Sequence, residues 1–335
     1  MSLPVPLPSF PPASGLRARH PVDLRADAEA MAAVANASLA ATGEPARESG
    51  PELYNELLNQ AHGDPLADVA LVERESRLVA YARVQWRDHA SGALEVETNL
   101  VLDPGLKAPG PGPALLRWAM AHGRTYAVGQ PAERPRWFAA WCGDEERWTR
   151  ALLDTAGFRP VRHFQLLVRP TLGDLGPPPP LPAGLEDRPV RPEHWRAVWE
   201  ADLEAFRDHW GTPDTSEAGF ARFQGEASQR PDLWQVAWAG DEVAGFVLVA
   251  VQEAENAALG VKRGWLDSVA VRRPWRRRGL ATALVARALV ALRDAGFEGA
   301  ILGVDAENPH EATALYVRAG FATSASATVY HLPFA

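Results

Sequence analysis

The stretch "VRRPWRRRGLATAL", from Val271 to Leu284, sets five arginines directly before a glycine and an apolar run with helical spacing. A glycine-containing loop that opens a helix is typical of phosphate binding, because free N–H groups and the positive helix end converge there. Gly279 and Ala281 carry little or no side chain, so a pyrophosphate can approach the backbone closely. A charged turn that only faces solvent would explain the loop equally well when it is taken alone.

Patterns on both sides of this stretch predict alternating strands and helices. The run "GWLDSVAV", residues 264–271, has the β-rich composition of a strand, and helical spacing follows from 282 to 295. Upstream we expect helices at 194–206 and 217–228 and a hairpin at 233–252. Downstream we expect a strand at 299–306, a helix at 309–319 ended by Gly320, and a last strand at 328–332.

A proline-rich segment divides the chain near its middle, because four consecutive prolines forbid a helix and a sheet ladder. The first half repeats the order of the second: "LLDTAGF", ending at Phe158, matches "LYVRAGF", ending at Phe321. We therefore expect an internal duplication. The expected parts are an extended arm at 1–15, a first domain at 16–170, a linker at 171–184 and a second domain at 185–335.

Two motifs in the second half together resemble the GCN5-related N-acetyltransferase (GNAT) superfamily. Arg276, Gly279 and Ala281 match the family's acetyl-CoA loop. The second motif follows in the family's order, with Asn308, Ala312, Leu315, Tyr316, Gly320 and Phe321. The resemblance implies an α/β (α+β) fold of two tandem GNAT-like domains, each with a mixed, mostly antiparallel central sheet flanked by helices.

The resemblance also implies acetyl-CoA as co-substrate, without a metal. In this family the sheet splays open between the strands at 264–271 and 300–306, and the pantetheine arm lies in the split. Asn308 is then a partner of that arm, or only a helix cap. The residues implied to bind acetyl-CoA are Val269, Ala270, Val271, Arg276, Arg277, Arg278, Gly279, Leu280, Ala281, Thr282 and Asn308.

Tyr316 matches the family's general acid by position; a tyrosine packed on a helix is the alternative. Two residues are candidates for the general base. Asp267 lies on the strand before the loop, where regular alternation puts it on the same face as Val269 and Val271. His209, whose unperturbed pKa of about 6.5 suits a base, follows the first helix of this half; a structural role beside Trp210 is the alternative.

The aligned loop of the first half has lost these features. Lys107, Gly110 and Gly112 stand opposite the three motif residues, but Pro109, Pro111 and Pro113 lie between and beside them, and proline has no N–H to offer a phosphate. Leu153 replaces Tyr316, and Glu145 replaces Asn308. We therefore expect the first half to be a degenerate copy that supports the fold or shapes the acceptor pocket.

The composition of the chain limits the classes of partner that it is expected to bind. The net charge of −8, shared by both halves, disfavours a nucleic-acid-binding protein. The single cysteine, Cys142, fits a buried hydrophobe in a cytoplasmic protein, and no apolar run predicts a membrane span. We expect an acetyltransferase, monomeric or homodimeric, whose acceptor is a small-molecule or peptide amine. A non-catalytic acyl-CoA sensor is the alternative.

Overall fold

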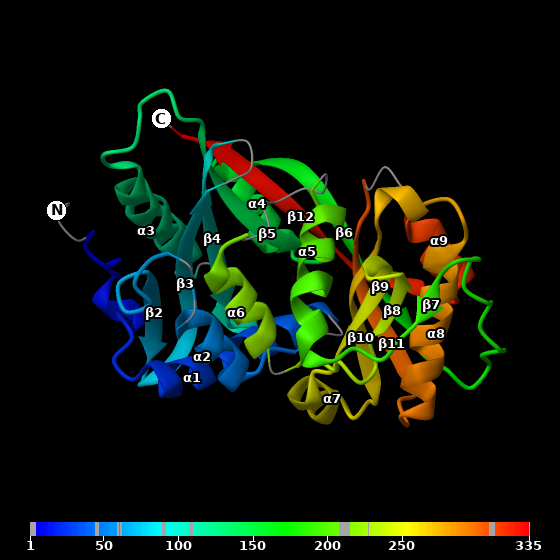
Figure 1. The fold of residues 1–335 in the computed structure, drawn as a ribbon. Coiled ribbons are helices and arrows are strands. Elements are labelled where there is room, and N and C mark those ends of the chain that lie inside the picture. The colour runs from blue at the N-terminus through cyan, green and yellow to red at the C-terminus, as the bar shows by residue number, and fades with distance from the viewer. Residues whose placement is uncertain are drawn as a thin grey trace. The chain divides into compact units, whose positions relative to one another are not determined.

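We describe the chain from a computed structural model, which describes residues 5–43, 47–58, 60, 62–88, 92–106, 110–207, 215–226, 228–307 and 312–334. The residues form two compact units, and Figure 1 shows their elements. Unit 1 comprises residues 1–163 and 325–335, and unit 2 comprises residues 164–324. The mixed α/β architecture, with mostly antiparallel strands flanked by helices, confirms the predicted fold class.

Unit 1 is built on a mostly antiparallel sheet with the strand order β1-β2-β3-β4-β5-β12. β4 and β5 are the parallel pair. Helix α3 packs against β3 and β4, and α1 packs against α2 and β3. The elements are β1 (Leu16–Arg19), α1 (Leu24–Thr42), α2 (Gly50–Leu58), β2 (Val69–Arg74), β3 (Arg77–Asp88), β4 (Leu94–Leu102), α3 (Gly112–Arg124), β5 (Arg136–Gly143), α4 (Arg147–Thr155) and the end of β12 (Ala322–Pro333).

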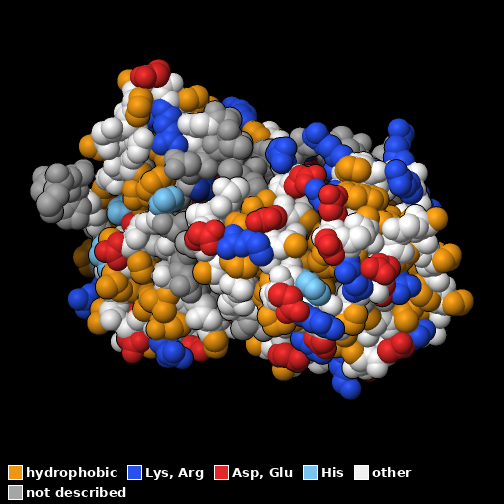
Figure 2. Space-filling model, viewed as in Figure 1, with side chains coloured by type: hydrophobic (Ala, Val, Ile, Leu, Met, Phe, Trp, Pro, Cys, Tyr) orange, Lys and Arg blue, Asp and Glu red, His pale blue; other side chains and the backbone are white. Residues whose placement is uncertain are grey.

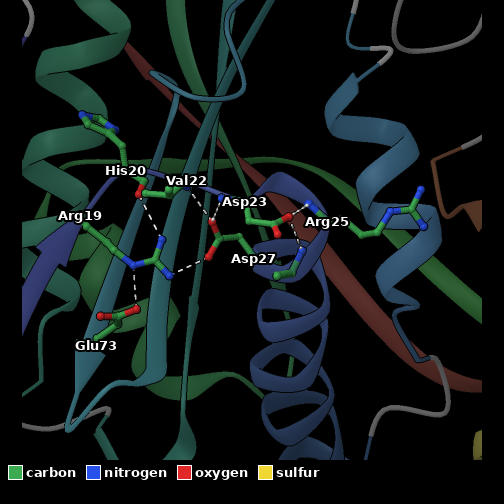
Figure 3. Close-up of polar contacts among 8 residues, drawn as sticks. Arg19, His20, Val22, Asp23, Arg25, Asp27 and Glu73 are labelled. Carbon is green, nitrogen blue, oxygen red and sulfur yellow. Dashed lines mark hydrogen bonds and ion pairs between the residues drawn. The ribbon is translucent and has the colours of Figure 1, made fainter.

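The start of α1 is tied to the sheet by a polar cluster (Figure 3). Asp23 caps the helix by accepting from the amides of Arg25 and Ala26, both at 3.1 Å. The Arg19 guanidinium donates to Asp27 at 2.6 Å and to Glu73 of β2 at 2.7 Å. Although burial alone would raise the pKa of Asp27, the bonds from Arg19 and the Val22 amide lower it.

In unit 2 the strands of the sheet follow the order β6-β11-β10-β9-β8-β7. β10 and β11 are its parallel pair. Helices α5 and α8 lie on opposite faces of this sheet (Figure 1). The elements are β6 (Arg159–Arg169, of which 164–169 belong to this unit), β7 (Glu186–Asp187), α5 (Trp195–Ala205), α6 (Glu217–Gly225), β8 (Gln235–Ala239), β9 (Glu242–Ala250), α7 (Glu253–Leu259), β10 (Arg263–Val271), α8 (Leu280–Asp294), β11 (Gly299–Asp305) and α9 (Ala312–Arg318).

Each sheet contains a strand segment that comes from the other half of the sequence. The end of β6, from Phe164 to Arg169, pairs antiparallel with β11 of unit 2. The end of β12, from Ala327 to Pro333, pairs antiparallel with β5 of unit 1. Because each sheet is completed in this way, the first half supplies hydrogen bonds to the strand that borders the candidate site.

Burial explains where the helices sit. Leu280, Leu284 and Leu289 of α8 are each 1% exposed and pack into a core that includes β9 and β10. On the face in Figure 2, Lys and Arg are interspersed with Asp and Glu rather than gathered in a continuous basic surface. Within the described residues, no helix is long and apolar enough to cross a membrane.

Candidate active site

The parallel pair of unit 2 diverges, as the family resemblance implied. β10 and β11 are paired at Arg263 with Gly299, Gly264 with Ala300 and Trp265 with Ile301. Beyond this point β10 continues to Val271 and β11 to Asp305, without pairs between these described residues. The second half of β10 therefore has a free edge, whose backbone N–H and C=O groups can bond to a ligand.

A β-bulge lies where the divergence begins. Leu266 pairs with Val249 of β9, and Ser268 pairs with the adjacent Leu248, so Asp267 has no partner in the ladder. A bulge bends its strand and re-aims side chains. It also breaks the alternation on which we based the placement of Asp267 beside Val269 and Val271.

The bulge moves Ser268 to another face of the sheet. Gly264 faces α8, because a Cβ built on it would lie 2.3 Å from a methyl carbon of Leu292. Regular alternation would give Ser268 the same direction. Instead, Ser268 Oγ donates to Asp202 Oδ1 of α5 at 2.6 Å, on the opposite face. Sequence reasoning did not identify Asp202.

The three residues of β10 implied to bind acetyl-CoA differ in the direction of their backbone N–H and C=O groups. The Ala270 carbonyl points to β9, since a Cβ built on Gly245 would lie 2.8 Å from its oxygen. By alternation the polar groups of Val269 and Val271 point to the free edge. Arg276 Nε confirms this direction by donating to the Val271 carbonyl at 2.9 Å. Val269 therefore offers the free N–H and C=O pair nearest the split.

The loop after β10 is an open cradle of amides. Arg277 and Gly279 both have left-handed backbone conformations, with φ of 61° and 80°. This conformation costs a non-glycine residue about 1 kcal/mol, which is typical of functional loops. Among the described residues, no group accepts from the amides of Leu280, Ala281 or Thr282 in the first turn of α8. A Cβ built on Gly279 would meet no atom of the described residues within 4 Å.

The side chains of the loop divide into buried anchors and exposed charges. Leu280 is 1% exposed, so it contributes its amide to the cradle and its side chain to the core. Arg276 is half-buried and bound to Val271, whereas Arg277, Arg278 and Thr282 are exposed. Arg277 and Arg278 are therefore the arginines available to an anionic ligand.

Tyr316 lies on α9 with its ring in the core of unit 2. It is 6% exposed, and its ring lies 6.1 Å from that of Phe321. Burial raises its pKa to about 12, so the hydroxyl remains protonated near neutral pH. Among the described residues, no group forms a hydrogen bond with this hydroxyl, which leaves it free to donate to a ligand.

Two carboxyl groups with raised pKa values lie at the bulge. The pKa of Asp202 is raised to about 6 by burial, which outweighs the bond from Ser268, and by the charge of Asp267. The Asp267 side chain reaches solvent, but protein atoms crowd around it, and this desolvation raises its pKa. Gln229 donates to Asp267 at 2.8 Å. His209 and Asn308, the other two predicted site residues, lie outside the described residues.

The sequence analysis did not identify Asp202, because this residue lies on an apolar face of α5. Val198, Ala201 and Ala205 are all buried, and Asp202 shares their face of α5 at the spacing i, i+3, i+4, i+7. A carboxyl in such a stripe is the one available signal, because a polar group buried among core residues needs a partner or a function.

In the counterpart loop of unit 1, protein atoms lie close beside both glycines, whereas Lys107 and Pro109 lie outside the described residues. A Cβ built on Gly112 would lie 2.0 Å from the ring of Trp148 in α4, and one on Gly110 would lie 1.5 Å from the Leu106 carbonyl oxygen. Leu153, opposite Tyr316 in the alignment, is 3% exposed in the core. Cys142 is buried, and burial raises the pKa of its thiol to about 12, which suits the predicted role as a buried hydrophobe.

Comparisons with known proteins agree with this geometry. The Acetyltransferase (GNAT) family model matches residues 195–321. The mycothiol acetyltransferase of Salinispora arenicola strain CNS-205 is 30% identical over 263 residues, covering 73% of this chain and 75% of that protein. That of Streptomyces bingchenggensis strain BCW-1 is 27% identical over 299 residues, covering 86% and 89%.

Solved structures extend the similarity to the whole chain. A GCN5-related N-acetyltransferase from Sphaerobacter thermophilus has a TM-score of 0.77 and 28% identity, covering 97% of both chains. A tandem GNAT protein from the clavulanic acid biosynthesis pathway has a TM-score of 0.67 at 18% identity, covering 95% of this chain and 98% of that one, which shows the shared fold. The chain therefore belongs to the GNAT superfamily, as a tandem member with a layout similar to mycothiol synthase, and it is an acetyl-CoA-dependent acetyltransferase.

Proposed function

We propose that unit 2 transfers the acetyl group of acetyl-CoA directly to the primary amine of a small molecule or peptide. One observation carries this proposal: β10 and β11 diverge directly before an open cradle of free amides. An extended amide-containing chain fits the free edge of β10, and a pyrophosphate fits the cradle. The close contacts beside Gly110 and Gly112 of unit 1 support the assignment of catalysis to unit 2 alone.

The residues present fit acetyl-CoA. The amides of Leu280, Ala281 and Thr282 point out of the positive end of α8, and the space beside Gly279 is open. Arg277 and Arg278 add charge at the surface of the cradle. Val269 supplies one N–H and one C=O to the pantetheine arm. Bound in this way, acetyl-CoA supplies the reactive thioester, and the chain supplies its orientation.

The hydroxyl of Tyr316 stabilises the sulfur that leaves when the C–S bond breaks. Its pKa of about 12 compares with about 8.5 for a thiol, so complete proton transfer to a free thiolate is uphill by about 5 kcal/mol. The hydroxyl therefore acts as a hydrogen-bond donor that shares its proton with the sulfur as the C–S bond breaks. Having no partner among the described residues, it breaks no existing bond to do so.

The acceptor amine must lose a proton. An alkylamine with a pKa of about 10.4 needs roughly 4 to 5 kcal/mol for deprotonation at pH 7, and a positioned base supplies part of this. Asp267, in the bulge beside the split, is a candidate for that base. The similarity to mycothiol acetyltransferases favours a small-molecule amine over a peptide amine as the acceptor.

The test is a titration with acetyl-CoA by calorimetry, followed by a thiol-release assay. The amines are S-methylcysteine amide, glucosamine, putrescine and lysine, chosen because they carry no thiol that would react with the reagent. We expect binding, thiol release with at least one amine, and the mass of its acetylated product. Binding without release would favour an acyl-CoA sensor, and no binding would overturn the proposed site.

A further inference from the structure

The polar group at the bulge is arranged to move a proton. Ser268 Oγ donates to Asp202 Oδ1 at 2.6 Å, and Ser268 stands at the start of the free edge of β10. Its oxygen keeps lone pairs that can accept from a donor in the split. The contact exists only because the bulge turns Ser268 away from α8 and toward α5.

Asp202 is half-buried beside the core of unit 2. Val198, Ala201 and Ala205 on the same face of α5 are 0%, 4% and 4% exposed. The hydrogen bond from Ser268 Oγ orients the carboxylate toward β10, which suits a group that must accept a proton at one place.

Within the described residues, no cation forms an ion pair with Asp202. The charge that acts on it comes from Asp267 of β10, which has the same sign. Among the described charged groups on neighbouring elements, Glu217 of α6 pairs with Arg196, and Arg272, after β10, pairs with Glu204 and with Glu242 of β9. Asp202 thus differs from most buried carboxylates, which are neutralised by a cation.

We propose that Ser268 and Asp202 form a relay that removes the proton from the acceptor amine during acetyl transfer. Ser268 is the group that contacts the amine, and Asp202 receives the proton through it. This inference rests on the proposed function and names a base other than Asp267, whose carboxylate is held by Gln229.

An N–H bond of the protonated amine breaks and its proton passes to Ser268 Oγ, while the hydroxyl proton of Ser268 passes to Asp202 Oδ1. The electron pair left on nitrogen forms the bond to the thioester carbon. The C–S bond then breaks, and the sulfur leaves with the electron pair of that bond, stabilised by a hydrogen bond from the hydroxyl of Tyr316. The nitrogen loses a second proton as the amide forms, and this proton neutralises the thiolate.

The acid–base properties suit this role. A general base works best with a pKa near the working pH, and burial raises the pKa of Asp202 to about 6. The base form is lost as the pH falls below this value. The rate for the wild-type chain should therefore rise with pH through about 6 and then level off.

The test compares pH profiles of kcat/KM from pH 5 to 10, with the amine of the panel that the wild type acetylates fastest. Asp202→Asn should lower the rate at pH 7 by roughly 100-fold or more and remove the limb near pH 6. The kcat/KM of this variant should approach that of the wild type near pH 10, where the amine deprotonates in water. Ser268→Ala should behave similarly, and Ser268→Thr, which keeps the hydroxyl, should restore the limb.

Control variants distinguish a loss of catalysis from a loss of the folded structure. Glu200→Gln removes an exposed carboxylate from the same helix and should leave the profile unchanged. All variants should keep the acetyl-CoA affinity of the wild type in calorimetry. An unchanged profile for Asp202→Asn, with active wild type, would overturn the relay alone. Absence of thiol release from the wild type would overturn the relay and the proposed function together.

Discussion

Arg169, the last residue of β6, donates a hydrogen bond from its guanidinium to the carbonyl of Ala319, just after α9. Arg169 is 7% exposed, and it also pairs with Asp174. A guanidinium at the end of a helix satisfies a free carbonyl and opposes the helix dipole. The end of the first half thereby supports the short helix that carries Tyr316.

Gly320 lets Arg169 reach this carbonyl. It has φ of +86°, and a Cβ built on it would lie 1.6 Å from Arg169 Nη1. We predict that Gly320→Ala destabilises the chain by about 2 to 3 kcal/mol, from backbone strain plus displacement of the guanidinium.

The matched control for this change is Gly43→Ala. Gly43 ends α1 with φ of +75°, and no atom in the described part of the chain lies within 4 Å of a Cβ built on it, so only the strain of about 1 kcal/mol remains. Urea unfolding of both variants measures the difference. Equal losses in the free energy of unfolding of the two variants would show that the Arg169 side chain can move away without loss of stability. This result would contradict its supporting role.

Tyr316→Phe should separate catalysis from stability. We expect turnover to fall by roughly 100-fold, because the leaving sulfur loses its donor, with the acetyl-CoA affinity unchanged. The melting temperature should stay near that of the wild type, since no described residue loses a bond with the hydroxyl. Tyr330→Phe, a buried tyrosine of unit 1, is the control. An unchanged rate in Tyr316→Phe would remove Tyr316 from the chemistry.

Asp27→Ala should weaken unit 1. This carboxylate is 5% exposed and is the partner of the Arg19 guanidinium, so its removal leaves a cation without its buried partner. We expect a loss of about 3 kcal/mol in the free energy of unfolding. Asp23→Ala, which removes only the cap of the same helix, should cost about 1 kcal/mol. Denaturant titrations compare them, and a smaller loss for Asp27→Ala than for Asp23→Ala would contradict this assignment.

Local patterns in the sequence predicted much of unit 2. The turn at residues 240–241, the helix after Gly279 and the divergence of β10 from β11 are all present, since turn glycines, helical spacing and the family motif act locally. Helix α7, which follows β9, was missed because it is only seven residues long and lacks a recognisable periodic stripe.

Features that depend on distant partners were not predictable. Nothing local shows that residues 164–169 pair with β11, or that 327–333 pair with β5. The bulge at Asp267 was also invisible, because one extra residue in a strand leaves the composition unchanged. Without the bulge, the contact between Ser268 and Asp202 could not be foreseen, and a polar residue on a buried helix face was the remaining signal.

The measurement that bears most directly on acetyl-CoA binding at unit 2 is calorimetric titration of Gly279→Val with acetyl-CoA. A branched side chain would occupy the open space of the cradle, and we expect affinity to fall by about 100-fold, equivalent to about two charge-assisted hydrogen bonds. Gly296→Val, at the other end of α8, carries a similar strain at φ of +88° and open space, and it should bind like the wild type. Wild-type affinity in Gly279→Val, with its fold intact, would contradict the assignment of this loop as the coenzyme site.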